Sequence, residues 1–165
     1  MAREVLYRVC YGTSKAAEYP LTAAHAANLK ITDAILHDYS RRRVRFADYP
    51  GMIPQNGHTV RGTYVTGLRD ADIGQLDLFE GYQYRRDKVR VVLLKKKGKG
   101  DEMEEAGERE AETYVWIDGE DGLEEREWDF LEFRREKMHK WADHSHEYDG
   151  ESVRLGIVRA GGTDE

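Results

Sequence analysis

The order of apolar and polar residues along the chain predicts about six strands. Each predicted strand either alternates apolar and polar residues or is a short apolar run, and the six lie at residues 5–11, 31–39, 42–46, 59–66, 84–94 and 112–117. The first is almost entirely apolar, which is typical of a central strand. The fifth is the clearest, because Val89, Val91 and Leu93 share one face.

Two shorter helices are predicted between the strands. A proline and a threonine give start signals for a helix at residues 21–29, where the chain is rich in alanine. Asp70 or Asp72 can cap a second helix, which runs to about Glu80 and can be stopped by Gly81. The second helix matters most for function, because it ends on a carboxylate.

The other segments read as one long helix and several loops. Residues 123–141 have the longest helical pattern, with large apolar side chains on one face. Residues 49–54 are rich in proline and predict a rigid loop. Residues 95–110 contain mainly Lys, Gly and Glu, which predicts a solvated hairpin loop. From residue 143 onward the chain is polar except at residues 153–158.

Strands that cluster without strict alternation with helices predict an α+β fold with a small, mixed and largely antiparallel sheet. Such a sheet can curl into a barrel-like shape, and periodicity alone leaves its closure open. The length of 165 residues is that of one domain. We therefore predict one domain over residues 1–142, with residues 143–165 as a polar tail or a late edge strand.

Composition narrows the class of partner. The net charge of −6 argues against a general affinity for nucleic acid or for anionic membranes. Cys10 is the single cysteine, so no intrachain disulfide can form. No apolar run approaches the ~18 residues of a membrane span, and the first residues lack the pattern of a signal peptide. These features predict a soluble cytoplasmic protein and leave its oligomeric state open.

Glu80 is the leading candidate for chemistry. Ile73, Leu76 and Glu80 follow helical spacing, so the carboxylate is expected to point toward the sheet. Burial disfavours the charged form, and so does the negative end of the helix dipole, so both are expected to raise the pKa of Glu80. A raised pKa suits a general base. The alternative is an exposed helix end or an ion pair with Arg85 or Arg86.

A second candidate is the segment Tyr11-Gly12-Thr13-Ser14, which follows the first predicted strand. A glycine at a strand end lets backbone N–H groups turn toward a ligand, and Thr13 and Ser14 add hydroxyl donors. The segment could hold a carboxylate or a phosphate. It lacks the Gly-Lys-Ser/Thr ending of a Walker loop, and an ordinary turn is the alternative.

Three further features read as structural. Arg41, Arg42 and Arg43 form a basic patch together with Arg45, and we expect this patch at a solvent-facing strand edge. Cys10 reads as a small core residue of the first strand. The His-Ser-His motif at residues 144–146 reads as solvated tail rather than as a metal site, because no third anchored ligand accompanies it.

Five sequence features occur in order along residues 5–141. The first three are Tyr11-Gly12-Thr13, the Tyr49-Pro50-Gly51-Met52 loop and Arg61-Gly62. The last two are Leu76-Asp77-Leu78-Phe79-Glu80-Gly81, which is followed by Tyr84 and Arg86, and the predicted helix that carries Trp128. Together they resemble the gamma-glutamyl cyclotransferase-like family, in the branch that includes the plant avirulence-induced proteins. The Leu-Asp-x-Phe-Glu-Gly element is the specific part of this resemblance.

The resemblance implies a small fold with a barrel-like sheet and a defined reaction. Glu80 would take a proton from the α-amino group of a small gamma-glutamyl substrate, and the freed amine would attack its own γ-carbonyl. The products would be 5-oxoproline and an amine or amino acid. The resemblance further implies that Tyr11, Gly12, Thr13 and Ser14 hold the glutamyl group and that Tyr84 completes the pocket. It implies no metal and no organic cofactor.

Two other functions stay open at this point. A catalytically silent module could keep the pocket for a small carboxylate ligand. An acyl-transfer or amide-cleaving enzyme acting on a specialised metabolite could reuse the same glutamate and loop. Release of 5-oxoproline from gamma-glutamyl compounds separates the cyclotransferase from the silent module.

Overall fold

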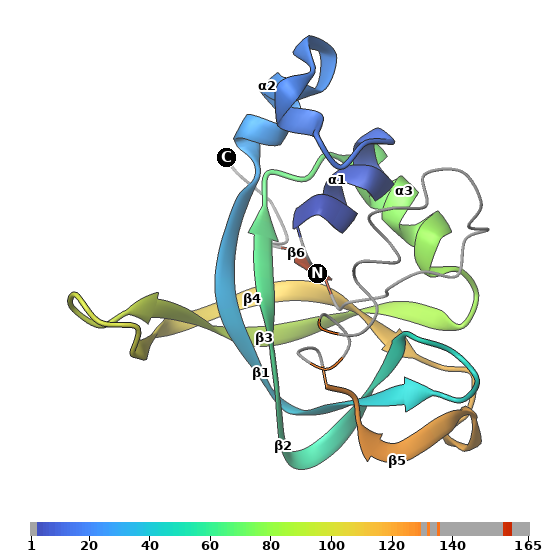
Figure 1. Cartoon of the computed structure of the whole chain (residues 1–165). Helices are drawn as coiled ribbons and strands as arrows, with labels where there is room; N and C mark the ends of the chain where they lie inside the picture. Colours follow the sequence, from blue (N-terminus) through green and yellow to red (C-terminus); the bar gives the residue numbers. More distant parts are fainter. Residues whose placement is uncertain (1–2, 130–131, 133–134, 136–156, 160–165) are drawn as a thin grey trace.

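The computed structural model describes residues 3–129, 132, 135 and 157–159, and it confirms the α+β class (Figure 1). The helices are α1 (Arg3–Tyr11), α2 (Pro20–Asn28) and α3 (Asp70–Glu80), with short 3-10 turns η1 (Ala16–Glu18) and η2 (Glu120–Gly122). The strands are β1 (Lys30–Val44), β2 (Pro50–Thr66), β3 (Tyr84–Lys96), β4 (Met103–Trp116), β5 (Leu123–Glu127) and β6 (Ile157–Arg159).

The strands close into a ring, which confirms the barrel-like sheet. Neighbouring pairs run β1–β2, β2–β6, β6–β4, β4–β3 and β3–β1, and β5 adds to the far part of β1. Only the β2–β6 pair is parallel, so the sheet is mixed. The three residues of β6 lie between β2 and β4 rather than at an edge. Closure leaves few unpaired strand edges around the core.

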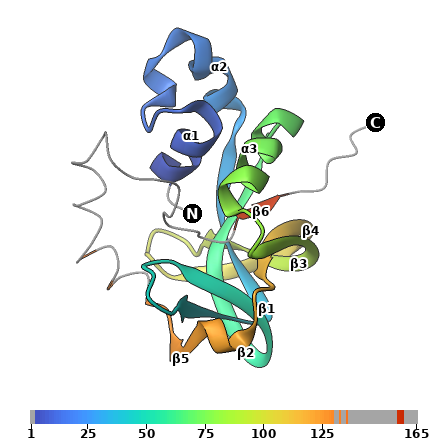
Figure 2. The same ribbon diagram turned by 90° about the vertical axis from the view of Figure 1, so that its right-hand side faces the viewer.

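The three helices gather at one end of the sheet, and β5 lies at the other end (Figures 1 and 2). The hairpin of β3 and β4 projects beyond the other strands in Figure 1. None of the helices in the described ranges is long and apolar enough to cross a membrane.

Among the described residues, the two larger apolar clusters lie on either side of β4, and a third, small cluster joins α1, η1 and α2. One lies under α1 and α3 and includes Leu6, Leu76 and Tyr114. The other lies inside the ring of β1 to β4 and includes Leu36 and Val91. Because β4 lies between the two larger clusters, the region around Glu80 is separate from the interior of the ring.

The strand β1 is a single long strand, although the sequence predicts two short ones. A β-bulge between His37 and Tyr39, where Asp38 has φ 61°, lies near the end of the first predicted strand and shortly before the predicted break at residues 40–41. The Asp38 side chain accepts a hydrogen bond from the backbone N–H of Gly57 at 2.9 Å, which holds the bulge against β2. A bulge bends a strand without ending it, so the alternation breaks while the pairing continues.

The prediction of a rigid loop at residues 49–54 is wrong, because β2 begins at Pro50, which pairs with Arg43 of β1. Proline is tolerated as the first residue of a strand, where its missing N–H costs no ladder bond. The prediction of a solvated loop at residues 95–110 is wrong for the second half of that segment, since β4 begins at Met103. Ion pairs between β3 and β4, such as Lys95 with Glu104 at 3.1 Å, lie along this exposed hairpin.

The segment predicted as the first strand is the helix α1. Leu6 and Tyr7 are buried on the face that packs toward α3 and η1, and partly buried Cys10 follows at helical spacing. Glu4 in the first turn and Arg8 in the last turn match the helix dipole. Packing of this face outweighs the strand propensity of the valines in the segment, which is the usual way that tertiary contacts override propensity.

The helix α3 matches its prediction at both ends. Its first turn is closed by Asp72, whose carboxylate accepts hydrogen bonds from the Arg69 backbone at 2.9 Å and from the Arg69 side chain at 2.7 Å. Gly81 ends the helix with φ 69°, and its N–H donates to Asp77 O at 3.0 Å. A positive φ at this position favours glycine.

We expect Asp72→Asn to lower the free energy of unfolding by about 0.5–2 kcal/mol at neutral pH, the usual loss for a capping side chain. Burial acts to raise the pKa of Asp72, but the hydrogen bonds from Arg69 outweigh it and hold the pKa below 3.8. Because the folded-state pKa is depressed, the contribution is complete above the unfolded pKa and is lost as the pH falls through the folded one.

The difference between wild type and Asp72→Asn should therefore shrink below about pH 3.8 in urea unfolding curves recorded across pH. Asp70→Asn is the matched control, because Asp70 is exposed in the same helical turn and shares the dipole effect. Equal losses in the two variants, or a difference that does not depend on pH, would contradict the role given to the Arg69 contacts.

The long helix predicted at residues 123–141 is wrong for its first five residues, which form β5 and pair with β1. Leu123 is buried in the core cluster under α3, and Trp128 is buried beyond the end of the strand. Of residues 128–141 the structure describes 128, 129, 132 and 135, and the last two are helical. The other residues of that predicted helix, the His-Ser-His motif at residues 144–146 and most of the predicted tail lie outside the described residues. The predicted division into residues 1–142 and 143–165 stays a prediction.

Candidate functional site

Glu80 is buried in the last turn of α3, with 1% of its surface exposed. Ile73 and Leu76 are buried on the same face of the helix, so the carboxylate points toward the sheet as the spacing predicts. The alternative of an exposed helix end is therefore excluded. A carboxylate in this position is costly to bury, so its neighbours decide what it can do.

Tyr114 of β4 lies close enough to Glu80 for the charge of that carboxylate to act on it. Its hydroxyl donates a hydrogen bond of 2.6 Å to Asp77 Oδ1, one helical turn before Glu80. Burial raises the pKa of Tyr114, and the bond to Asp77 and the negative charges of Asp77 and Glu80 raise it further. Arg86 completes the group at 3.7 Å from Asp77 and 3.8 Å from Glu112. The hydroxyl of Tyr114 thus stays protonated and donates its proton to Asp77.

We expect Tyr114→Phe to lower the free energy of unfolding by about 1–3 kcal/mol, because the Asp77 carboxylate loses a charge-assisted hydrogen bond. Urea unfolding measures the change. Tyr82→Phe is the matched control, since Tyr82 is exposed just beyond the same helix and should tolerate the change. Equal stability of the two variants would show that the Tyr114–Asp77 bond does not hold α3 on the sheet.

Tyr84 lies beside this group at the start of β3. Its ring meets Trp116 edge-on, with the ring centroids 5.3 Å apart, and its hydroxyl donates to the carbonyl oxygen of Pro50 at 2.9 Å. The aromatic ring therefore lies under the end of α3, in the same core cluster as Leu76. Because the backbone of β2 already accepts the hydrogen bond of the Tyr84 hydroxyl, this structure favours a packing role for Tyr84.

The segment from Tyr11 to Ser14 lies near the opposite end of α3. The Tyr11 ring lies 5.9 Å from the guanidinium of Arg69, which precedes the first turn of α3. Burial raises the pKa of Tyr11 to about 12, and the charge of Asp72 adds to this effect. Asp72 and Glu80 are eight residues apart, which is about 12 Å along a helix. These contacts place Tyr11 near the N-terminal end of α3 and Glu80 in its last turn.

The Gly12 amide and the Thr13 hydroxyl oxygen of that segment already have hydrogen-bond partners. The N–H of Gly12, which has φ 72°, donates to Arg8 O at 2.9 Å and so closes the end of α1. The N–H of Lys15 donates to Thr13 Oγ1 at 3.2 Å. Gly12 follows a helix rather than the predicted strand, so its N–H satisfies the helix instead of facing a ligand. Ligand binding by Tyr11, Gly12, Thr13 and Ser14 stays a prediction.

Sequence reasoning missed Tyr114 and named Arg86 only as a possible ion-pair partner of Glu80. Tyr114 and Arg86 face each other as paired residues of β4 and β3, a register that the sequence does not specify. Alternation along β4 does place Tyr114 and Trp116 on one face, and this was the available signal. No cluster of three or more potential metal ligands occurs in the part of the chain that the structure describes.

The basic patch is also placed differently from its prediction. Arg42 and Arg43 are half-buried and form ion pairs with Glu120 and Asp48. Arg41 is half-buried as well, with its guanidinium 5.6 Å from the ring centre of Trp128 and its Nε fully buried. All three side chains are therefore less exposed than the predicted solvent-facing edge.

Comparison with known proteins decides the family. Residues 9–130 match the family described as gamma-glutamyl cyclotransferase, AIG2-like. The chain belongs to this family. The match includes Tyr11, Glu80, Tyr84 and Tyr114, so both ends of α3 and the strands beneath it lie within the family domain.

Curated relatives from Arabidopsis thaliana agree with this assignment. Protein AIG2 C is 34% identical over 101 residues, which are 61% of this chain and 56% of that protein. Protein AIG2 A is 33% identical over 113 residues, which are 68% of this chain and 61% of that protein. The chain thus matches about three fifths of the length of these relatives.

Two solution structures of Arabidopsis thaliana proteins are similar to this chain. One has a TM-score of 0.47 and 28% identity, and the similarity covers 78% of this chain and 73% of the other. The second has a TM-score of 0.45 and 26% identity, and the similarity covers 69% of this chain and 70% of the other.

Proposed function

We propose that this protein is a gamma-glutamyl cyclotransferase in which Glu80 acts as the general base. The observation that carries the proposal is the buried carboxylate at the end of α3, within the domain that matches the family. A carboxylate held in an apolar surrounding is a stronger base than one in water, because burial disfavours its charged form. Family membership supports the reaction class, and the position of Glu80 supports the residue.

The proposed reaction needs one proton acceptor and good positioning. Glu80 takes a proton from the α-ammonium group of the substrate, and the nitrogen then forms a bond to the γ-carbonyl carbon. The attacking nitrogen then gives up a second proton, and the bond from the γ-carbon to the leaving nitrogen breaks. The leaving nitrogen takes up both protons, the first from Glu80, so the products are the neutral 5-oxoproline ring and the amine in its ammonium form. The attack is intramolecular, so holding the chain in a near-attack shape supplies much of the rate. Residues of the chain suffice for this proton transfer.

Substrate access requires a change in the packing around Glu80. Its side chain has almost no exposed surface, so a ligand that touches the carboxylate must displace a neighbouring group. Tyr84 and Trp116, in the cluster beneath the end of α3, belong to the wall that such a ligand would meet. Under this proposal Tyr84 packs against the bound glutamyl group, and the Tyr11–Ser14 segment contributes only after a rearrangement that brings it closer.

Release of 5-oxoproline from a substrate panel tests the proposal. The panel contains glutathione, gamma-glutamyl amino acids, gamma-glutamyl amines and gamma-glutamyl-lysine, and mass spectrometry measures the cyclic product. We expect at least one compound to yield 5-oxoproline in an enzyme-dependent manner. The proposal fails for this panel if every compound stays intact at high protein concentration while the protein remains folded.

A silent binding module is the second candidate, favoured by the close packing around Glu80 and by the engaged amides of Gly12 and Lys15. In that case the same compounds would bind without reacting. Calorimetric titration with intact gamma-glutamyl amines separates the two candidates, since saturable binding without product favours the module.

A further inference from the structure

Phe46 is the most exposed large apolar residue in the part of the chain that the structure describes, and its backbone conformation is strained. It lies in the turn between β1 and β2 with φ 62°, a left-handed conformation that bulky side chains rarely adopt. Its side chain is fully exposed, so no packing contact compensates for this strain. Asparagine or glycine would suit the turn better. This favours a role for the phenylalanine outside the single folded chain.

Three more exposed apolar residues lie on the same side of the molecule as Phe46. Leu78 and Tyr82 lie four residues apart at the end of α3 and are 77% and 85% exposed, and exposed Ile117 follows β4. The N–H of Ile117 donates to Gln83 O at 2.9 Å, next to Tyr82. The end of α3, the end of β4 and the turn after β1 all lie along the right-hand side of Figure 1, which faces the viewer in Figure 2. We call these four residues the apolar patch.

Hydrogen bonds join the turn that carries Phe46 to the rest of the apolar patch. The N–H of Arg45 donates to Gly122 O at 2.9 Å, and the Nε of Arg45 donates to the carbonyl oxygen of Asp121 at 2.8 Å. At the other end of the same segment, Gln83 Nε2 donates to Asp118 Oδ2 at 2.8 Å. Residues 117–122 therefore run between the turn after β1 and the end of α3, and the apolar patch extends over one side of the molecule.

Two exposed charges of opposite sign accompany the apolar patch. Arg45 donates to a backbone carbonyl, Asp118 accepts from a side-chain amide, and neither forms an ion pair with any residue that the structure describes. A two-fold axis through the patch would bring Arg45 of one copy toward Asp118 of the other, and would do so twice. The patch is therefore complementary to itself in charge, and its apolar residues can cover one another in the same arrangement.

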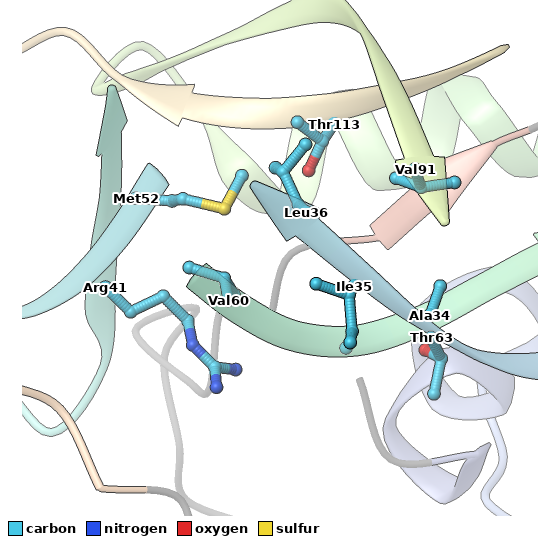
Figure 3. A pocket seen from close by; sticks show the side chains of 10 residues that line it. Ala34, Ile35, Leu36, Arg41, Met52, Val60, Thr63, Val91 and Thr113 are labelled. Atoms are coloured by element: carbon cyan, nitrogen blue, oxygen red, sulfur yellow. The ribbon is translucent and has the colours of Figure 1, made fainter. Parts of the chain in front are cut away.

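We propose that the apolar patch is the interface of a symmetric dimer, in which Phe46 of each copy packs on Tyr82 and Ile117 of the other. The cavity inside the ring of β1 to β4 has a volume of about 20 Å³ and is lined mainly by apolar side chains such as Leu36 and Val91 (Figure 3). This is room for about one water molecule, so Phe46 of a second copy must pack on the surface. A two-fold arrangement closes at two copies and does not continue into a filament.

The area of the apolar patch predicts weak, reversible association. An aromatic side chain buries about 150–250 Å², so two aromatic and two aliphatic side chains cover roughly 500–700 Å² on each copy. A standard interface buries about 800 Å² on each partner, and smaller ones belong to transient complexes. The strain at Phe46 is then explained, because the exposed ring is an anchor for the second copy. In dilute solution the chain is expected to be monomeric.

Sedimentation equilibrium of the full chain between about 5 μM and about 1 mM tests the proposal. We expect the mean molar mass to rise with concentration from that of one chain toward that of two, and no further. Backbone amide shifts recorded by NMR over the same dilution series locate the interface. Shifts that depend on concentration are expected at Phe46, Tyr82 and Ile117, and none is expected at Leu21, which is exposed at the start of α2.

Phe46→Asn tests the anchor. We expect the Kd of the dimer to rise about tenfold or more, because a symmetric interface loses the aromatic contact twice. The urea midpoint of the dilute, monomeric protein should stay the same or rise, because asparagine tolerates a positive φ. Tyr82→Asn should raise the Kd as well, and it serves if Phe46→Asn does not fold. Leu21→Asn is the matched control, since Leu21 is exposed away from the apolar patch and its loss should leave the Kd unchanged.

A charge exchange tests the two-fold arrangement. Arg45→Glu and Asp118→Arg should each raise the Kd several-fold, because like charges then face each other between the copies. The double variant Arg45→Glu/Asp118→Arg should recover most of the affinity, because the pair is formed again with its signs exchanged.

Several results would overturn the proposal. A chain that stays monomeric over the whole concentration series would do so, and the apolar patch would then belong to a contact with a different protein. An unchanged Kd in both Phe46→Asn and Tyr82→Asn, or an equal rise in Leu21→Asn, would also do so. A double charge variant that binds no better than the single ones would overturn the two-fold pairing of Arg45 with Asp118. The test does not depend on the proposed cyclotransferase, because it needs no substrate and no turnover.

Discussion

Replacing Glu80 with glutamine is expected to reduce 5-oxoproline formation by about 10²-fold or more, because the amide cannot accept the proton of the substrate ammonium. The change preserves the shape of the side chain, which is 1% exposed. It also removes the cost of burying a charge, so we expect the free energy of unfolding to stay the same or to rise. Initial rates with a saturating substrate and urea unfolding of the same preparation measure the two effects.

Glu108→Gln is the control for this variant, because Glu108 is exposed on β4 and undergoes the same chemical change. It should retain full turnover. Substrate affinity should change little in Glu80→Gln, since only the step after binding needs the base. Full turnover by Glu80→Gln would remove this residue from the mechanism. A loss of turnover that parallels a loss of folded protein would assign it a structural role instead.

The parts of the fold that the sequence predicts well are those set by local signals. The helix α3 has a capping aspartate at one end and a glycine at the other, and both signals depend on residues within the helix or next to it. The strand β3 alternates clearly enough to be found without knowledge of its partners. The direction of Glu80 follows from the same helical spacing, which is why its burial could be predicted.

The parts that the sequence does not predict depend on contacts between distant segments. The helix α1 carries valines that favour a strand, and only its packing toward α3 and η1 makes it helical. The partner of Asp77 is Tyr114, and their contact depends on how β4 pairs with β3 and on where α3 lies above them. The burial of Arg41 depends on closure of the ring and on Trp128. Register and closure are long-range properties, and neither has a local pattern.

Leu76→Ala is expected to lower the free energy of unfolding by about 2–5 kcal/mol, because it removes a buried side chain and leaves a cavity between α3 and the sheet. Leu76 is 0% exposed and lies one turn before Glu80 on the same face of α3. Leu78→Ala is the matched control on the same helix, since Leu78 is 77% exposed and its loss should change stability little. Urea unfolding of both variants measures the difference.

The same pair of variants connects the packing of α3 with the proposed chemistry. If the sheet holds α3 through Leu76, the position of Glu80 relaxes in Leu76→Ala, and turnover should fall even where the variant is still folded. Equal stability of Leu76→Ala and Leu78→Ala would contradict the packing described for α3.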